Sequence, residues 1–223
     1  VSLSVIDSVI ANVALPTLAS EFGTSSANSV WIVNAYQLAL ITTLLIFSNL
    51  GDILGYRRIY ISGLVLFTVA SAGCALSTTF ASLIAWRAVQ GIGAAAITSV
   101  NTTLIRIIYP RRMLARGMGI NATVVAVSSV AGPSVAAAIL SVTTWHWLFA
   151  VNLPVGLIAF TLSSRFLPQN PVKVEGRRFD WRSGVMCALT FGLVMACVEG
   201  YSHGMALHVW FVLAAVAAVV AWR

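Results

Sequence analysis

The sequence predicts an all-α, polytopic membrane protein with eight spanning helices. Of its 223 residues, 59% are hydrophobic and only 9% are charged, whereas a soluble domain carries about 25% charged residues. Its mean hydropathy is +0.94. Eight continuously apolar stretches approach or exceed the roughly 20 residues with which a helix crosses a bilayer. Because these stretches do not alternate between polar and apolar residues, a β-barrel is disfavoured.

Each apolar stretch is bounded by a short polar segment, and we expect each to form one helix. In chain order the expected helices cover residues 1–17, 29–50, 59–77, 82–105, 117–140, 147–167, 184–202 and 209–223.

We expect three parts in the chain. Residues 1–167 form an N-terminal six-helix bundle, residues 168–183 a cytoplasmic linker rich in basic residues, and residues 184–223 two additional helices, the second incomplete. The first stretch starts without a basic leader and the last is short, so we expect the chain to be part of a longer protein. Six helices in sequence suggest a three-plus-three repeat, but the two halves are too dissimilar to establish one.

Basic residues fall on one side of the predicted helices. With eight spans the connecting segments form two alternating sets, and every Lys and Arg except Arg87 belongs to one set. This positive-inside pattern predicts a multi-pass protein of the cytoplasmic (inner) membrane with its basic loops in the cytoplasm. The net charge of +7 therefore indicates topology, and we expect contact with the lipid bilayer and no binding of nucleic acid.

No pattern suited to catalysis or metal binding is recognisable. The three cysteines, at positions 74, 187 and 197, lie inside predicted helices without a close pair, as packed free thiols do. The three histidines lie near outer loops at spacings that do not suit a metal site. We expect no metal, no cofactor and no enzymatic activity.

Three ionisable residues, Asp7, Arg87 and Glu199, lie inside predicted helices. A charge at the bilayer centre costs about 2.5–3.5 kcal/mol on insertion scales, so such a residue usually faces a cavity or a partner. Glu199 is explained by its place near the outer end of its helix.

Asp7, Ser8 and Asn12 are spaced to give the first helix a polar side. An acid in a membrane helix that can bind and release a proton is what coupling to a proton gradient requires. The alternative is a structural acid that only joins helices.

Arg87 stays protonated, so we expect it to hold a neighbouring carboxylate ionised or to release it. Gly91 and Gly93 follow in a run of small residues, which lets helices pack closely. The alternative is an arginine whose side chain reaches the outer interface.

Four motifs stand in order along the chain: DSVIANVALP (7–16), SNLGDILGYRR (48–58), RAVQGIGAA (87–95) and AGPSVAA (131–137). Together they resemble the motifs of the major facilitator superfamily, and within it those of the fourteen-helix drug:proton antiporters of the EmrB/QacA type. Supporting stretches are WIVNAYQL (31–38), WHWLFAVNLPVG (145–156) and RRFDWRSG (177–184), the last of which favours the fourteen-helix branch. Ser48, Ile53, Ala136 and Ala137 depart from the usual motifs, so we expect altered gating or packing with the mechanism retained.

The resemblance implies proton-coupled efflux of lipophilic cationic drugs by alternating access, with the proton gradient as the energy source. It implies that Asp7 and Arg87 line a central cavity and handle the coupling proton. The other implied site residues are Asn12, Trp31, Tyr36 and Gln37 around the substrate, Asp52, Gly55, Arg57 and Arg58 in a gating loop, and Gly132 and Pro133 at the bundle interface. For Trp31, packing or an interfacial position is an equal alternative.

From the residues alone, Asp52 can pair with Arg57 or Arg58 across a tight turn at Gly55. Pro133 can bend the fifth helix or mark close packing.

Two alternative functions remain open. The protein could instead export a single metabolite on the same fold, or be a non-functional truncated membrane remnant. The implied C-terminal bundle is absent, so the chain as given should not transport alone.

Overall fold

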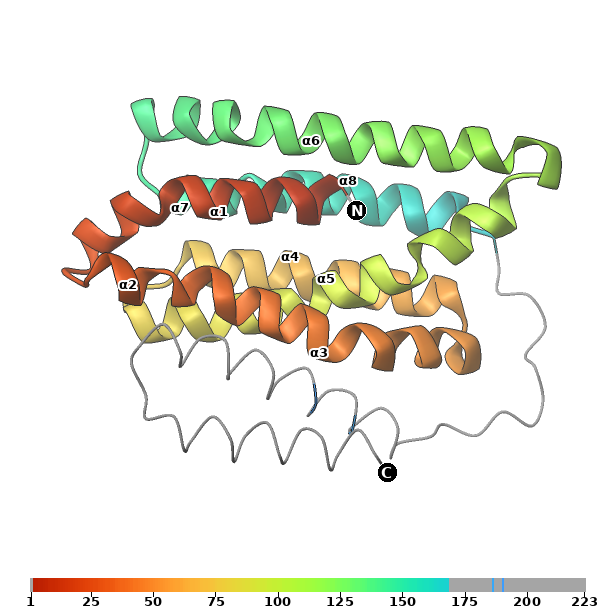
Figure 1. Ribbon diagram of the computed structural model, residues 1–223, viewed down its shortest axis with the longest axis horizontal. Coiled ribbons are helices and arrows are strands. Elements are labelled where there is room, and N and C mark those ends of the chain that lie inside the picture. Colours follow the sequence, from red (N-terminus) through yellow and green to blue (C-terminus); the bar gives the residue numbers. More distant parts are fainter. Residues whose placement is uncertain (1, 169–185, 187–189, 191–223) are drawn as a thin grey trace.

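The computed structural model describes residues 2–168, together with Met186 and Thr190, and all regular structure in these residues is helical (Figure 1). Six segments of this part are long and apolar enough to cross a membrane. The predicted all-α membrane fold is confirmed in the described part, which holds six of the eight predicted spanning segments. The predicted linker and the seventh and eighth helices, with Cys187, Cys197 and Glu199, lie outside the described residues.

The helices run side by side along one direction (Figure 1). Their bounds are α1 Ser2–Glu21, α2 Ser26–Ser29, α3 Trp31–Leu54, α4 Tyr56–Ala75, α5 Phe80–Ile108, α6 Leu114–Val142, α7 His146–Ala150 and α8 Asn152–Phe166, with a 3-10 turn at Arg111–Met113 before α6. The short helices α2 and α7 extend α3 and α8, so that each pair forms one spanning segment.

Helix starts and stops follow from local chemistry. The side chain of Ser25 accepts from the backbone N–H of Asn28 at the start of α2, and Thr79 accepts from the N–H of Ser82 at the start of α5. These bonds satisfy N–H groups that have no partner within the first turn. Gly55 separates α3 from α4 with φ of 99°, a conformation that favours glycine.

The prediction of a loop over residues 51–58 was wrong, because only Gly55 interrupts the helices there. Asp52 lies in the last turn of α3, and Arg57 and Arg58 lie in the first turn of α4. The fall in hydropathy marks where the chain leaves the apolar layer, whereas the backbone hydrogen bonds continue the helix beyond that point.

α5 is the most buried of the described spanning helices. Half of its most apolar window is buried, against 17% for the segments that contain α3 and α6. The small residues at positions 91 and 93–96 are all among its buried residues. Valines such as Val127 and Val130 on α6 are exposed, as side chains that face lipid or another bundle are in a membrane protein.

Three of the helix contacts follow the pattern of a three-plus-three repeat, although α5 packs extensively on α4 and the equivalent pair, α1 and α8, makes little contact. The second spanning segment packs on the fourth, through α3 and α5, and the fifth packs on the first, through α6 and α1. Exchanging the two halves converts one pair into the other. The third and sixth segments, α4 and α8, pack on each other as elements on an exchange axis would.

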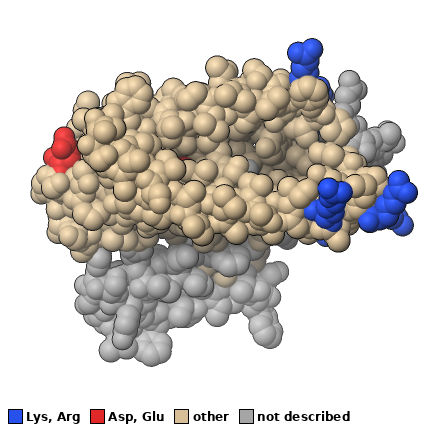
Figure 2. Space-filling view, turned by 90° about the horizontal axis from the view of Figure 1, so that it is seen from above, with Lys and Arg blue, Asp and Glu red and all other residues tan. Residues whose placement is uncertain are grey.

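The described charges separate towards the two ends of the helices. Figure 2 shows basic side chains at one end and an acidic side chain at the other. The exposed basic residues lie at the junctions or ends of α3–α4, α5–α6 and α8, whereas Glu21 ends α1. Arg87 is the exception, because it is buried in the middle of the bundle.

Candidate functional site

Asp7 of α1 and Arg87 of α5 form an ion pair inside the bundle. Nη1 of Arg87 donates to Oδ2 of Asp7 at 2.6 Å, and the side chains are 0% and 1% exposed for Arg87 and Asp7, respectively. Two charges removed from water are tolerated when they are paired and hydrogen-bonded. Sequence analysis assigned no partner to either residue, and in the fold they are each other's partner.

Two amide side chains complete the shell of the carboxylate. Nε2 of Gln90 donates to Oδ1 of Asp7 at 2.9 Å, and Nδ2 of Asn152 donates to the same oxygen at 2.5 Å. Gln90 and Asn152 are also buried. The carboxylate thus accepts three hydrogen bonds from side chains of two other helices.

The orientation of the Gln90 amide is fixed by the charges on its two sides. Its Oε1 accepts from Nη1 of Arg87 at 2.6 Å, while its Nε2 donates to Asp7 and, at 2.8 Å, to Oγ of Ser71 on α4. Reversing the amide would turn its oxygen towards the carboxylate and its N–H groups towards the guanidinium. Gln90 is therefore a polarised bridge within the ion pair.

Aromatic rings and one carbonyl surround Arg87. Its Cζ lies 4.3 Å from the ring centroid of Tyr36 and 5.7 Å from that of Phe149, and its Nε donates to the carbonyl of Ile32 at 3.2 Å. Rings at these distances attract a cation. Within the described part, Nη2 of Arg87 has no hydrogen-bond partner.

Two glycines of α5 bring these helices together. A Cβ at Gly91 would lie 2.3 Å from the carbonyl oxygen of Tyr36 on α3, and one at Gly93 would lie 2.6 Å from the backbone nitrogen of Phe67 on α4. Neither position leaves space for a methyl group. Because Gly91 lies one turn beyond Arg87, the same close approach sets the Arg87–Tyr36 contact.

We call the side chains of Asp7, Ser71, Arg87, Gln90 and Asn152 the polar cluster. Its members come from α1, α4, α5 and α8, and each is at most 1% exposed. In this structure Asp7 and Arg87 therefore face each other and do not line an open cavity.

The predicted substrate residues separate into two groups. Tyr36 is buried against Arg87, and its hydroxyl donates to the carbonyl of Ser4 at 3.3 Å. Asn12 is exposed on another side of α1 from Asp7 and donates to the carbonyl of Ser8. Trp31 and Gln37 are half-buried on α3. The prediction that Asp7 and Asn12 share one side of the helix was therefore wrong, because five residues of a helix turn through about 140° beyond a full turn.

The predicted gating residues lie at the basic end of the bundle. Oδ1 of Asp52 accepts from the hydroxyl of Tyr56 at 2.6 Å. Arg57 donates to the carbonyl of Ser164 in the last turn of α8, where a cation complements the unpaired carbonyls of the helix end. Arg58 is exposed.

Gly132 and Pro133 differ in burial, although they are neighbours on α6. Gly132 is buried, and a Cβ there would lie 2.7 Å from Cγ1 of Val9 on α1. Pro133 is exposed, and α6 continues through it as one helix. Gly132 alone therefore marks close packing of α6 on α1.

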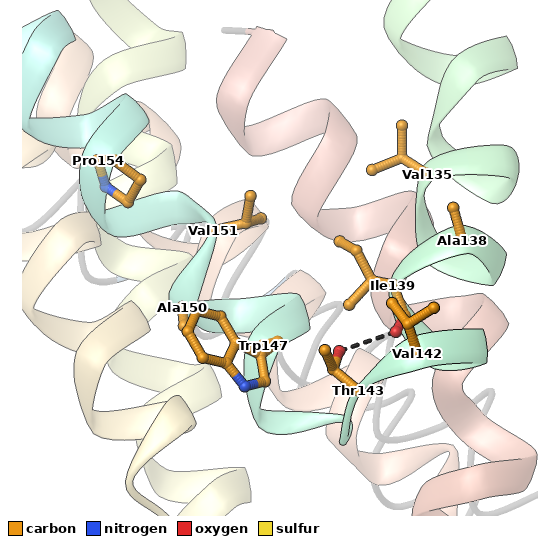
Figure 3. Close-up of a pocket in the computed structure, with 9 residues that line it drawn as sticks. All are labelled: Val135, Ala138, Ile139, Val142, Thr143, Trp147, Ala150, Val151 and Pro154. Atoms are coloured by element: carbon orange, nitrogen blue, oxygen red, sulfur yellow. Dashed lines mark hydrogen bonds between the residues drawn. The ribbon is translucent and has the colours of Figure 1, made fainter.

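An apolar pocket of about 470 Å³ lies apart from the polar cluster, between α6 and the α7–α8 segment (Figure 3). Its lining residues are Val135, Ala138, Ile139, Val142, Thr143, Trp147, Ala150, Val151 and Pro154. The hydroxyl of Thr143 donates to the carbonyl of Ile139 on its own helix, so the lining presents little free polar chemistry.

Three residues of the polar cluster were not among the predicted site residues. Gln90 could have been found, because an amide three residues after a membrane-embedded arginine shares its helix face. Asn152 is an amide within the apolar stretch FAVNLPVG and carries a weaker signal. Ser71 carries none, because a serine can bond to its own helix, as Ser71 also does to the carbonyl of Phe67.

Comparisons with known proteins agree on one family. The model of the Major Facilitator Superfamily matches residues 1–222. "Uncharacterized transporter YebQ" of Escherichia coli is 54% identical over 93% of this chain and 45% of its own length. "Riboflavin transporter RibZ" of Clostridioides difficile is 32% identical (81% and 40%), and "Putative multidrug resistance protein MdtD" of Salmonella typhi is 30% identical (92% and 43%).

The solved structures show the same fold. A bacterial homologue of the human lysosomal transporter Spinster, in an inward-facing and occupied conformation, matches with a TM-score of 0.51 at 18% identity, over 90% of this chain and 49% of that one. The chain spans less than half the length of these curated relatives. The family model, the relatives and the fold together show that the chain belongs to the Major Facilitator Superfamily of membrane transporters.

Proposed function

We propose that this chain is the N-terminal part of a proton-coupled exporter of the fourteen-helix drug:proton antiporter type in the cytoplasmic membrane, with Asp7 as the proton-binding residue. The observation that carries this proposal is the buried ion pair of Asp7 and Arg87, at 2.6 Å. The basic end of the bundle would face the cytoplasm, by the positive-inside rule. A C-terminal bundle of the same polypeptide would complete the transport path.

Protonation of Asp7 weakens the closed polar cluster, because it removes the charge that Arg87 and the two amides bind. Oδ1 of Asp7 accepts from two amides and Oδ2 accepts from Arg87. These three bonds leave one acceptor position open on Oδ2, and a proton that adds to the carboxylate leaves Arg87 as a buried cation without a counter-ion. Because that state is costly, proton binding would drive a rearrangement of α1 relative to α5 and α8, and proton release would restore the closed cluster.

Lipophilic cations are the first candidate substrates. The relative named as a putative multidrug resistance protein supports this class, and the Tyr36 and Phe149 rings beside Arg87 could contact a cation once the cluster opens.

A single neutral or anionic metabolite is the second candidate. The carboxylate of Asp7 is covered by three donors and is 1% exposed, so the closed cluster presents no negative charge to a cation. The relative named as a riboflavin transporter points to the same class. The competing idea of a truncated remnant predicts no transport by the natural gene product.

Transport by the full-length protein in inverted membrane vesicles tests the proposal. Ethidium and riboflavin serve as the two probes, and an imposed proton gradient is the driving force. We expect gradient-driven movement of one probe, and its loss in Asp7→Asn. Uptake that persists unchanged in Asp7→Asn would remove Asp7 from the mechanism, and the probe that moves distinguishes the two substrate classes.

A further inference from the structure

Asn152 lies at an interruption in the last described spanning segment. α7 ends at Ala150, and α8 begins at Asn152, with Val151 between them. Pro154 has no amide hydrogen, so it cannot donate to the carbonyl of Ala150 four residues earlier. Figure 3 shows Val151 and Pro154 on this segment, beside the apolar pocket. The junction lacks one backbone hydrogen bond and is therefore a place where the segment can bend.

The side chain of Asn152 connects this junction to the proton-binding residue. Its Nδ2 donates to Oδ1 of Asp7 at 2.5 Å, across 145 residues of sequence, and the side chain is 1% exposed. An amide N–H can only donate, so the bond is strongest while the carboxylate is ionised. Gln90 donates to the same oxygen but belongs to the helix of Arg87, so Asn152 is the contact that brings α8 to Asp7.

We propose that Asn152 is a positioning residue that favours the ionised form of Asp7 and transmits its protonation to the α7–α8 junction. This inference rests on the proposed function of Asp7 as the proton-binding residue. A proton that adds to the carboxylate weakens the bond from Nδ2, and the junction is then released from α1. Loss of the Asn152 donor makes the carboxylate easier to protonate.

The test is an infrared titration of the purified full-length protein in lipid vesicles. The carbonyl-stretch band of protonated Asp7 is identified as the band that Asp7→Asn removes, so no substrate is needed. We expect Asn152→Leu to move the midpoint of this band towards higher pH by about one unit, because one charge-assisted hydrogen bond to the ionised form is lost. Asn152→Ser is a smaller change for the case that Asn152→Leu does not fold.

Asn101→Ala is the matched control. Nδ2 of Asn101 on α5 donates to Oδ1 of Asn121 on α6 at 3.1 Å, so this variant also removes an amide bond between helices but touches no member of the polar cluster. We expect it to leave the midpoint in place. An unchanged midpoint in both Asn152 variants, or an equal shift in Asn101→Ala, would overturn the role of Asn152 and leave the proposed function intact. Absence of any band that depends on Asp7 would overturn both.

Discussion

Removing Asp7 from the buried ion pair should cost more stability than removing Arg87. In Asp7→Asn the guanidinium of Arg87 stays charged, fully buried and opposite an amide. Removing one partner of a buried pair typically costs about 3–5 kcal/mol, because an uncompensated charge remains. We expect Asp7→Asn to lose stability in this range at every pH at which the protein can be handled.

Arg87→Met should be less destabilising, because the remaining carboxylate can take up a proton and become neutral. The double variant should cost less than the sum of the two single changes, with a coupling free energy of about 2–3 kcal/mol.

The assay is thermal unfolding of the full-length protein in detergent, followed for the wild type, both single variants and the double variant at several pH values. A second scan checks reversibility, because large membrane proteins often unfold irreversibly. Additive losses in the double variant, or wild-type stability in Asp7→Asn, would refute the view that the two buried charges stabilise each other.

Two further predictions concern packing and helix ends. Gly91→Val should strongly destabilise the bundle, because its Cβ would lie 2.3 Å from the Tyr36 carbonyl oxygen. Gly119→Ala on α6 meets nothing within 4 Å and should stabilise the protein by about 0.5–1 kcal/mol. Unfolding midpoints of the two variants are compared, and equal losses of stability would contradict the packing argument. Arg57→Ala should lower the unfolding free energy by about 1 kcal/mol or more, because its hydrogen bond to α8 is lost. Arg58 is exposed, so Arg58→Ala should change stability little. Similar losses of stability in both variants would contradict a capping role for Arg57.

Much of the fold could be predicted because the bilayer imposes simple rules. Spanning helices must be long and apolar, so hydropathy identified six segments to within a few residues. The break at Gly55 was predicted as a turn, but its length was overestimated because hydropathy reports membrane exit and not the end of a helix.

The site was only partly predictable, because helix packing determines which polar side chains meet. The cost of a charge in lipid singled out Asp7 and Arg87, but their direct contact depends on the approach of α1 to α5. Asn12 was assigned to the side of Asp7 from its spacing, whereas the packing of α1 leaves it exposed. Asn152 is 145 residues from its partner, a distance over which sequence periodicity carries no information.

The most direct test of the central claim is whether protonation of Asp7 opens the polar cluster. Spin labels introduced by Thr17→Cys on α1 and Ala85→Cys on α5, both exposed positions, would report the α1–α5 distance by pulsed electron resonance after the native cysteines are replaced. The account predicts a longer distance at acid than at alkaline pH in the wild type, and the acid-state distance at every pH in Asp7→Asn. Identical distances at both pH values in the wild type, or a pH response that survives in Asp7→Asn, would contradict it.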